Sequence, residues 1–117
     1  MNSVLIIATV GCVVANGFMA IADYARAPFV LANSAEVRLK PAALPYLATL
    51  KLAGAAGLLL GLLGVHWLGL AAGVGLTAFF IGAVLFHVRA RVFHNIAFPG
   101  AYLLLAVAGT SFFMGAL

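Results

Sequence analysis

Charged side chains are scarce in this sequence of 117 residues, and acidic ones are the scarcest. Lys, Arg, Asp and Glu together make up 7% of the chain, whereas a soluble domain contains about 25%. Asp23 and Glu36 are the only two carboxylates, so general acid–base catalysis has few candidate residues. The sequence also contains no Ser-His-Asp or Cys-His arrangement, no glycine loop of the phosphate-binding kind and no pair of carboxylates. It therefore carries no recognisable catalytic motif.

Cysteine is limited to Cys12, which excludes an internal disulfide and a dithiol redox centre. We interpret this thiol as a small apolar side chain that contacts lipid or a neighbouring helix. Long polar segments are lacking as well, because residues 27–45 form the only polar connection of any length. Little of the chain is left for a domain outside a membrane.

Apolar residues, by contrast, make up 67% of the chain, and the mean hydropathy is +1.26. This composition is typical of an integral membrane protein, and the length allows about four spans of roughly 20 residues. We predict an all-α transmembrane four-helix bundle that forms a single domain over 1–117, with spans at about 3–24, 46–64, 68–88 and 96–116. Residues 28–39, between the first two spans, suit a short interfacial helix.

Spans that cross the membrane alternately would place every charged side chain on one side of it. These residues are Asp23, Arg26, Glu36, Arg38, Lys40, Lys51, Arg89 and Arg91. The positive-inside rule makes that side cytoplasmic and both termini non-cytoplasmic. We therefore interpret the basic pI of about 9.9 as a topology signal that suits anionic lipid headgroups, and we expect no nucleic-acid partner.

Lys51 is the charged residue that most needs a partner. A cation within about 19 uncharged residues costs roughly 2.5–3.5 kcal/mol at the middle of a membrane. Asp23, near the end of the first span, is predicted to lie within about 5 Å of the same depth. Because spans joined by one loop are usually neighbours, we expect these two charges to pair.

Other polar side chains are predicted to join this pair in the same leaflet. His87 and Arg89 enter from the third span, and Tyr24 and Tyr46 lie at the interface. Asn16 shares one helix face with the aspartate and marks the inward side of the first span. Two interpretations stay open: a structural cluster that only neutralises and orients the helices, or a cavity for a sterol, a quinone or another hydrophobic molecule with one polar end.

The three histidines do not predict a haem or metal site. His66 is expected on the opposite side of the membrane from the other two. His87 and His94 would stand about 10 Å apart along a continuous helix, which is too far for one ion.

Glycines recur along the second and third spans, with spacings of 3, 4 and 3 in the second. A stripe of a helix without side chains allows another backbone to approach closely. We therefore predict that this stripe contacts a partner membrane subunit or forms a homodimer through Gly54, Gly57, Gly61, Gly69 and Gly73.

Four short motifs follow one another along nearly the whole chain. They are Ile21-Ala22-Asp23-Tyr24, Leu44-Pro45-Tyr46-Leu47, Lys51-Leu52-Ala53-Gly54-Ala55 and Gly82-Ala83-Val84-Leu85-Phe86-His87-Val88-Arg89-Ala90. In this order they resemble the DoxX-like family of small four-span bacterial membrane proteins. The resemblance implies a multi-pass protein of the bacterial inner (plasma) membrane, with polar groups at Asp23, Lys51 and His87. The chain differs from many members in lacking an acidic, tryptophan-bearing segment between the second and third spans.

The resemblance also implies a function. The namesake of the family is associated with a thiosulfate:quinone oxidoreductase, and other members resemble accessory subunits of membrane redox complexes. For this chain, the resemblance implies an accessory subunit or a binder of a quinone, lipid or sterol-like molecule. One alternative is a membrane-embedded isomerase or oxidoreductase in which Asp23 or His87 moves protons and Lys51 tunes them. The other is a small transporter, although only Asn16 stands where small multidrug transporters carry a glutamate.

Overall fold

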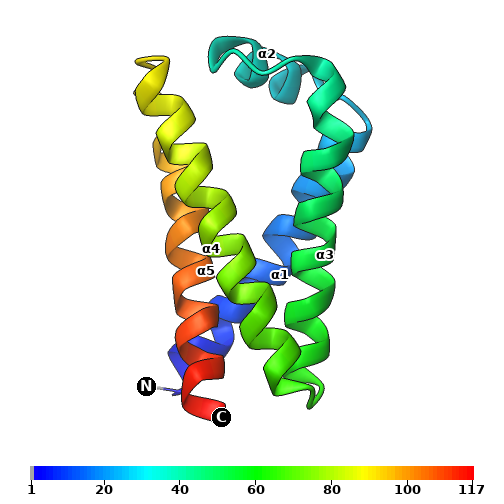
Figure 1. The fold of residues 1–117 in the computed structure, drawn as a ribbon, viewed down its shortest axis with the longest axis vertical. Helices are drawn as coiled ribbons and strands as arrows, with labels where there is room; N and C mark the ends of the chain where they lie inside the picture. The colour runs from blue at the N-terminus through cyan, green and yellow to red at the C-terminus, as the bar shows by residue number, and fades with distance from the viewer. Residues whose placement is uncertain (1) are drawn as a thin grey trace.

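The computed structural model describes residues 2–117, and the chain is helical over most of this range (Figure 1). The elements are α1 (Asn2–Tyr24), α2 (Pro28–Glu36), the short 3-10 helix η1 (Pro41–Ala43), α3 (Leu44–Leu62), α4 (His66–Arg89) and α5 (Ala97–Ala116). Four of the helices are long and apolar enough to cross a membrane, and no strand occurs within residues 2–117. The predicted all-α class with four spans is confirmed.

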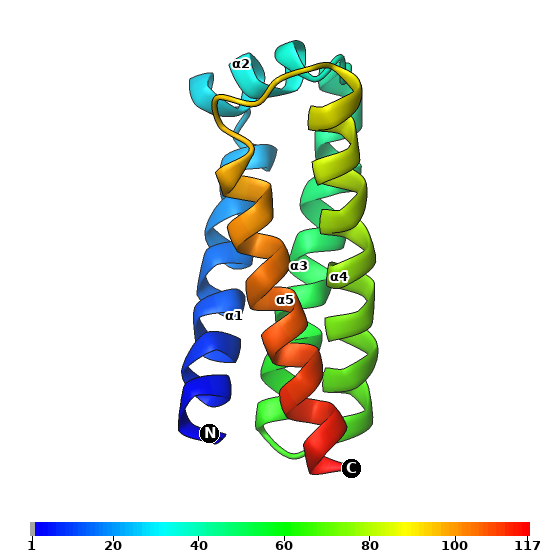
Figure 2. The ribbon, with the colours of Figure 1, turned by 90° about the vertical axis from the view of Figure 1, so that its left-hand side faces the viewer.

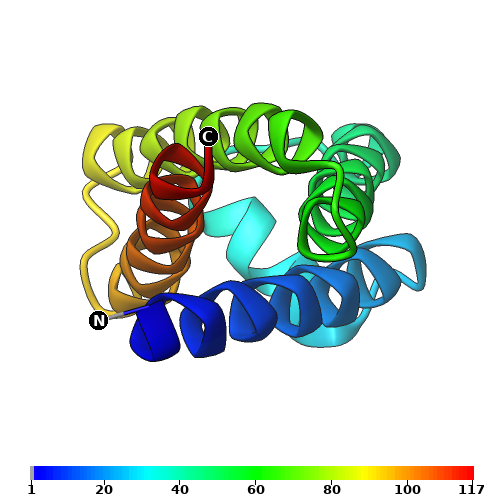
Figure 3. The same cartoon turned by 90° about the horizontal axis from the view of Figure 1, so that it is seen from below.

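The four long helices form a closed ring. Helix α1 packs against α3 and α5, and α4 packs against the same two helices from the other side (Figure 3). Both termini and the α3–α4 turn lie at one end, whereas α2 and the α4–α5 loop lie at the other (Figures 1 and 2). The helices therefore alternate in direction as predicted, which gathers the charged residues towards the α2 end.

The second and third spans begin two residues earlier than predicted. Pro45 lies in the first turn of α3, where a missing backbone N–H breaks no helical hydrogen bond. Helix α3 ends at Leu62, and the turn that follows contains Gly64, whose φ of +128° suits glycine alone; α4 then starts at His66. A short turn is enough to join these two antiparallel helices.

Glycines allow α3, α4 and α5 to meet closely in the half of the bundle that contains the termini. A Cβ atom on Gly61 would lie 2.5 Å from the Cα of Gly69 and 2.7 Å from Cζ of Phe113. The Phe113 ring is completely buried between these helices. Such distances are shorter than any real carbon contact, so only glycine fits here.

This packing corrects the predicted partner surface. All five glycines proposed for a partner or homodimer are buried, and a Cβ on each would lie only 2.5–2.7 Å from the nearest atom of another part of the same chain: Gly54, Gly57, Gly61, Gly69 and Gly73. The spacing predicted close helix packing correctly, but the neighbouring backbones belong to this chain. We therefore no longer expect a homodimer through these positions.

The ends of α1, α2 and α4 share an unusual cap. At each end the chain turns through a left-handed residue that is an arginine: Arg26 (φ 52°), Arg38 (φ 64°) and Arg91 (φ 56°). After α2, the N–H of Arg38 donates to the Ala35 carbonyl and the N–H of Leu39 to the Ser34 carbonyl, the Schellman pattern. Glycine is usual here, but arginine places a cation beside the negative end of the helix dipole and near headgroups.

Replacing Arg38 with glycine is expected to stabilise the protein slightly, by at most about 1 kcal/mol. The left-handed conformation costs an ordinary residue roughly 1–2 kcal/mol, and the greater unfolded-state freedom of glycine offsets about 0.5–1 kcal/mol of the gain. Thermal unfolding of the purified protein measures the change. Arg38→Ala is the control, because it removes the charge but keeps the strain; equal losses in both variants would mean that the guanidinium outweighs the strain.

Candidate functional site

A cavity of about 760 Å³ lies between the four long helices beneath α2. Its lining is mostly apolar and rich in aromatic rings: Phe18, Phe29, Phe79, Phe80, Phe86, Phe98 and Tyr102. The polar side chains of the lining are Asp23, Asn33, Ser34, Lys51, His87 and Asn95. A volume of roughly 300–1,000 Å³, apolar walls and a few polar groups are typical of sites that bind small molecules.

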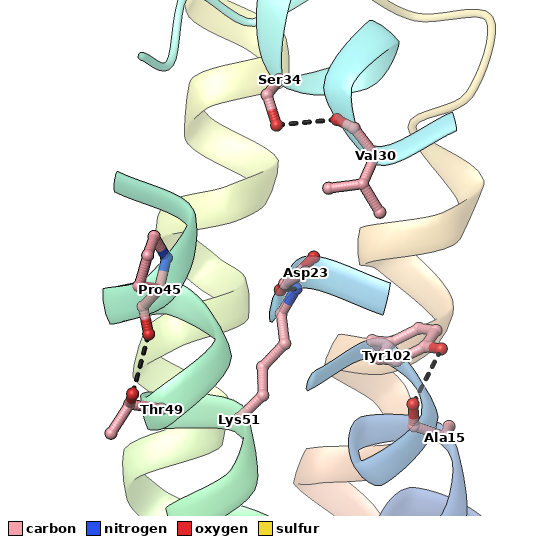
Figure 4. A network of polar contacts seen from close by, with 8 residues as sticks. All are labelled: Ala15, Asp23, Val30, Ser34, Pro45, Thr49, Lys51 and Tyr102. Carbon is pink, nitrogen blue, oxygen red and sulfur yellow. Dashed lines mark hydrogen bonds and ion pairs between the residues drawn. The ribbon is translucent and has the colours of Figure 1, made fainter. Parts of the chain in front are cut away.

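An ion pair between α1 and α3 lies in the wall of this cavity. The Nζ atom of Lys51 is 2.7 Å from Oδ2 of Asp23, and the two side chains are 11% and 2% exposed (Figure 4). The expected pairing is therefore present. The ammonium also lies 5.6 Å from the centre of the Phe79 ring, a favourable cation–π distance. Because the two charges neutralise each other, the cavity wall carries no net charge from this pair.

His87 contributes an unsatisfied polar atom to the same cavity. The residue is 4% exposed, and its Nδ1 lies 2.9 Å from the carbonyl oxygen of Ala83, one turn earlier in α4. A carbonyl only accepts hydrogen bonds, so we assign the proton of the neutral ring to Nδ1. Nε2 is then an acceptor, and it is buried without a partner among residues 2–117.

Two polar contacts hold α2 to the α4–α5 loop above the cavity. The Nδ2 of Asn95 donates to Oδ1 of Asn33 at 2.8 Å, and Nε2 of His94 lies 2.6 Å from Oε2 of Glu36. The second contact is exposed and so contributes little to stability. The Oδ1 of Asn95 is buried and has no partner in the described chain.

Helix α2 covers the cavity with one face. Val30 and Ser34 of this helix, and Val37 directly after its end, recur every three to four residues and are buried, and all three line the cavity. The Ser34 hydroxyl donates to the Val30 carbonyl at 2.8 Å, so its own helix satisfies it (Figure 4). The predicted short helix thus exists, and its inward side forms part of the site.

Three of the seven predicted cluster residues line the cavity: Asp23, Lys51 and His87. Tyr24, Tyr46 and Arg89 do not. The Tyr24 hydroxyl lies 2.7 Å from Oγ1 of Thr49, Tyr46 is 75% exposed, and the guanidinium of Arg89 stacks 4.3 Å from the Phe86 ring. Each lies one to five residues from a predicted cavity residue, at the right depth but on another helix face.

Asn16 is also outside the cavity, for a different reason. It is buried on the inward face of α1, as predicted, but seven residues before Asp23 and so roughly 10 Å deeper. Its Nδ2 donates to the Cys12 carbonyl at 2.9 Å. Cys12 belongs to the hydrophobic core that contains Leu58 and Phe113, so Asn16 lies in the packed half of the bundle. Nearby, the Tyr102 hydroxyl donates to the Ala15 carbonyl at 3.3 Å and joins α5 to α1 (Figure 4).

The sequence did not indicate three polar residues of the cavity, Asn33, Ser34 and Asn95. The two asparagines are 62 residues apart and lie in α2 and in a loop, where polar side chains are common. Only their contact in space distinguishes them. His94 lies beyond the end of α4. No group of three or more His, Cys, Asp or Glu residues in the described chain is arranged to hold a metal ion.

The cavity opens towards the outside of the bundle. Phe18, Phe29 and Phe98 line it and yet are 54–71% exposed, so they form a mouth bordered by α1, α2 and α5. Leu50 and Phe79 line both the cavity and a separate groove of about 560 Å³ between α3 and α4. In a membrane, side openings of this kind would face acyl chains rather than water.

Comparison with known proteins identifies one family. The model of the DoxX-like family matches residues 7–109, a range that contains every residue of the cavity lining. No curated protein and no solved structure matches the chain significantly.

Proposed function

The chain belongs to the DoxX-like family of membrane proteins, and from this premise we propose that it binds a hydrophobic small molecule, such as a quinone, lipid or sterol-like compound, in the cavity beneath α2. One observation carries the proposal: an apolar, aromatic cavity in which the ion pair, His87 and Asn95 gather towards the α2 end. A ligand with an apolar body and one polar end matches a cavity whose walls are apolar and whose polar groups lie near one end.

Binding suits this arrangement better than proton-transfer catalysis. Asp23 and Lys51 are engaged with each other, so neither is a free acid or base in this geometry. The exposed aromatic residues at the mouth would let a lipid-soluble molecule enter sideways from the bilayer. We propose that the protein acts as a ligand-binding accessory subunit of a membrane oxidoreductase system in the bacterial inner membrane.

The orientation belongs to the same proposal. All six Lys and Arg residues lie towards the α2 end, so the positive-inside rule directs that end to the cytoplasm and both termini to the other side. The polar end of the ligand would then lie in the cytoplasmic leaflet.

Filling the cavity tests the proposal. Gly82 lines the cavity, and a Cβ there would meet no atom within 4 Å, so Gly82→Leu introduces a side chain without a clash at its first atom. We expect the amount of bound hydrophobic ligand to fall at least about tenfold relative to the wild type, since a loss of 1.4 kcal/mol in binding free energy weakens the affinity tenfold. The measurement is mass spectrometry of an organic extract of the purified protein, per mole of chain.

Gly75→Leu is the matched control. It lies on the same helix and also has free space at its Cβ, but it lines the outer groove and not the cavity. Both changes favour the helix. Equal ligand content in the two variants, or a wild-type extract that only mirrors the bulk membrane lipids, would refute the proposed function.

A further inference from the structure

Resting on the proposed function, we propose that the cavity selects an uncharged molecule with a hydroxyl group, and that the hydroxyl donates a hydrogen bond to Nε2 of His87. The ligand class is then a hydrophobic alcohol in the wide sense, which includes sterols, long-chain alcohols and quinols. Ethers, esters and quinones have only acceptors at their polar ends, so they do not meet this requirement.

The first step is the proton position on His87. Its Nδ1 is fixed as a donor by the Ala83 carbonyl at 2.9 Å, which leaves Nε2 as the acceptor of the neutral ring. The residue is 4% exposed and lines the cavity, and Nε2 has no partner within the described chain. Buried polar atoms are nearly always paired, so this atom is one that a ligand would satisfy.

The second step is the charge of the site. Lys51 is the one cation that lines the cavity among the described residues, and Asp23 neutralises it at 2.7 Å. An ionised carboxylate or ammonium on the ligand would be buried without a counter-charge, which is strongly unfavourable. The polar end of the ligand is therefore neutral.

The third step is that the remaining polar groups of the cavity offer both hydrogen-bond donors and acceptors. The Oδ1 of Asn95 is a second buried acceptor without a partner in residues 2–117. The ammonium of Lys51 has three hydrogens, of which the aspartate takes one. A hydroxyl can donate to an acceptor and accept from a donor at once, so it fits a wall that offers both better than a purely accepting group does.

The test compares three probes with the full-length protein in detergent: a 16-carbon alcohol, its methyl ether and the 16-carbon fatty acid. Native mass spectrometry measures the affinity of each. We expect the alcohol to bind about tenfold more tightly than the ether, because one buried hydrogen bond corresponds to roughly that factor. The ionised acid is expected to bind more weakly than the alcohol. A long-chain quinol against its quinone, and a sterol against its methyl ether, then identify which hydroxyl compound binds best.

Variants assign the effect to the imidazole. His87→Leu is expected to abolish the preference for alcohol over ether, whereas His87→Gln, which keeps an acceptor, retains part of it. His66→Leu, at the opposite end of the bundle, is the control and should keep the full preference. If His87→Leu does not fold, the wild-type protein still tests the inference. Equal affinities of the wild type for the alcohol and the ether would overturn it.

The outcomes separate this inference from the proposed function. Binding of alcohol and ether with equal affinity would leave a hydrophobic binder without hydroxyl recognition. Tighter binding of the ionised acid would refute the neutral polar end. Failure of all three probes, of the sterol and of both the quinol and the quinone would contradict the proposed function itself.

Discussion

Replacing Lys51 with methionine is expected to lower the free energy of unfolding by about 3–5 kcal/mol, the usual cost of removing one partner of a buried ion pair. The reason is Asp23, which is 2% exposed and would lose the charged partner that lies 2.7 Å away. The measurement is thermal unfolding of the purified protein in one detergent, compared with the wild type.

The double variant Asp23→Leu, Lys51→Met is the control for this prediction. Removing both charges leaves no unpaired group, so most of the lost stability should return. If the single variant is as stable as the wild type, the pair does not hold α1 to α3. A single variant that folds normally but loses its ligand would instead assign the lysine to binding.

Gly61→Leu is expected to destabilise the bundle by about 3 kcal/mol or more, at or above the upper end of the usual cost of overpacking. The new Cβ would lie 2.5 Å from the Cα of Gly69, and a backbone cannot rotate away as a side chain can. It would also meet the buried ring of Phe113. The measurement is the fraction of monodisperse protein and its unfolding temperature.

Gly115→Leu, near the end of α5, is the matched control, because a Cβ there meets no atom within 4 Å. It should leave the unfolding temperature nearly unchanged. The same experiment separates internal packing from dimerisation. A dimer surface would let Gly61→Leu fold and shift only the oligomeric state, and that result would contradict the packing described above.

The span pattern was predictable because it depends on properties that are local in the sequence. A run of apolar residues of sufficient length forms a helix that crosses lipid, whichever helices surround it. The glycine spacing likewise predicted close backbone contact, and that contact is present at Gly61, where a Cβ would lie 2.5 Å from the Cα of Gly69. The sequence did not identify whose helix supplies the contact.

The candidate site was predicted only in part, because depth and direction are separate properties. Helix rise fixes the depth of a residue to within a few ångström, so Asp23, Lys51 and His87 were predicted at one level, and all three line the cavity. Direction depends on how each helix is rotated in the bundle. Tyr46 and Arg89 show the difference, since both lie at the charged end and both face outwards.

By itself the sequence determined that this is a four-span membrane protein with all its charge at one end and with an aspartate and a lysine at matching depth. Run length, helix rise and the distribution of Lys and Arg are enough for those conclusions. Only the tertiary structure decided that α2 covers a cavity, that Asn33 and Asn95 meet across 62 residues and that the glycine faces are internal. These features depend on how whole helices rotate and pack, and contacts between segments that are distant in the sequence set that rotation and packing.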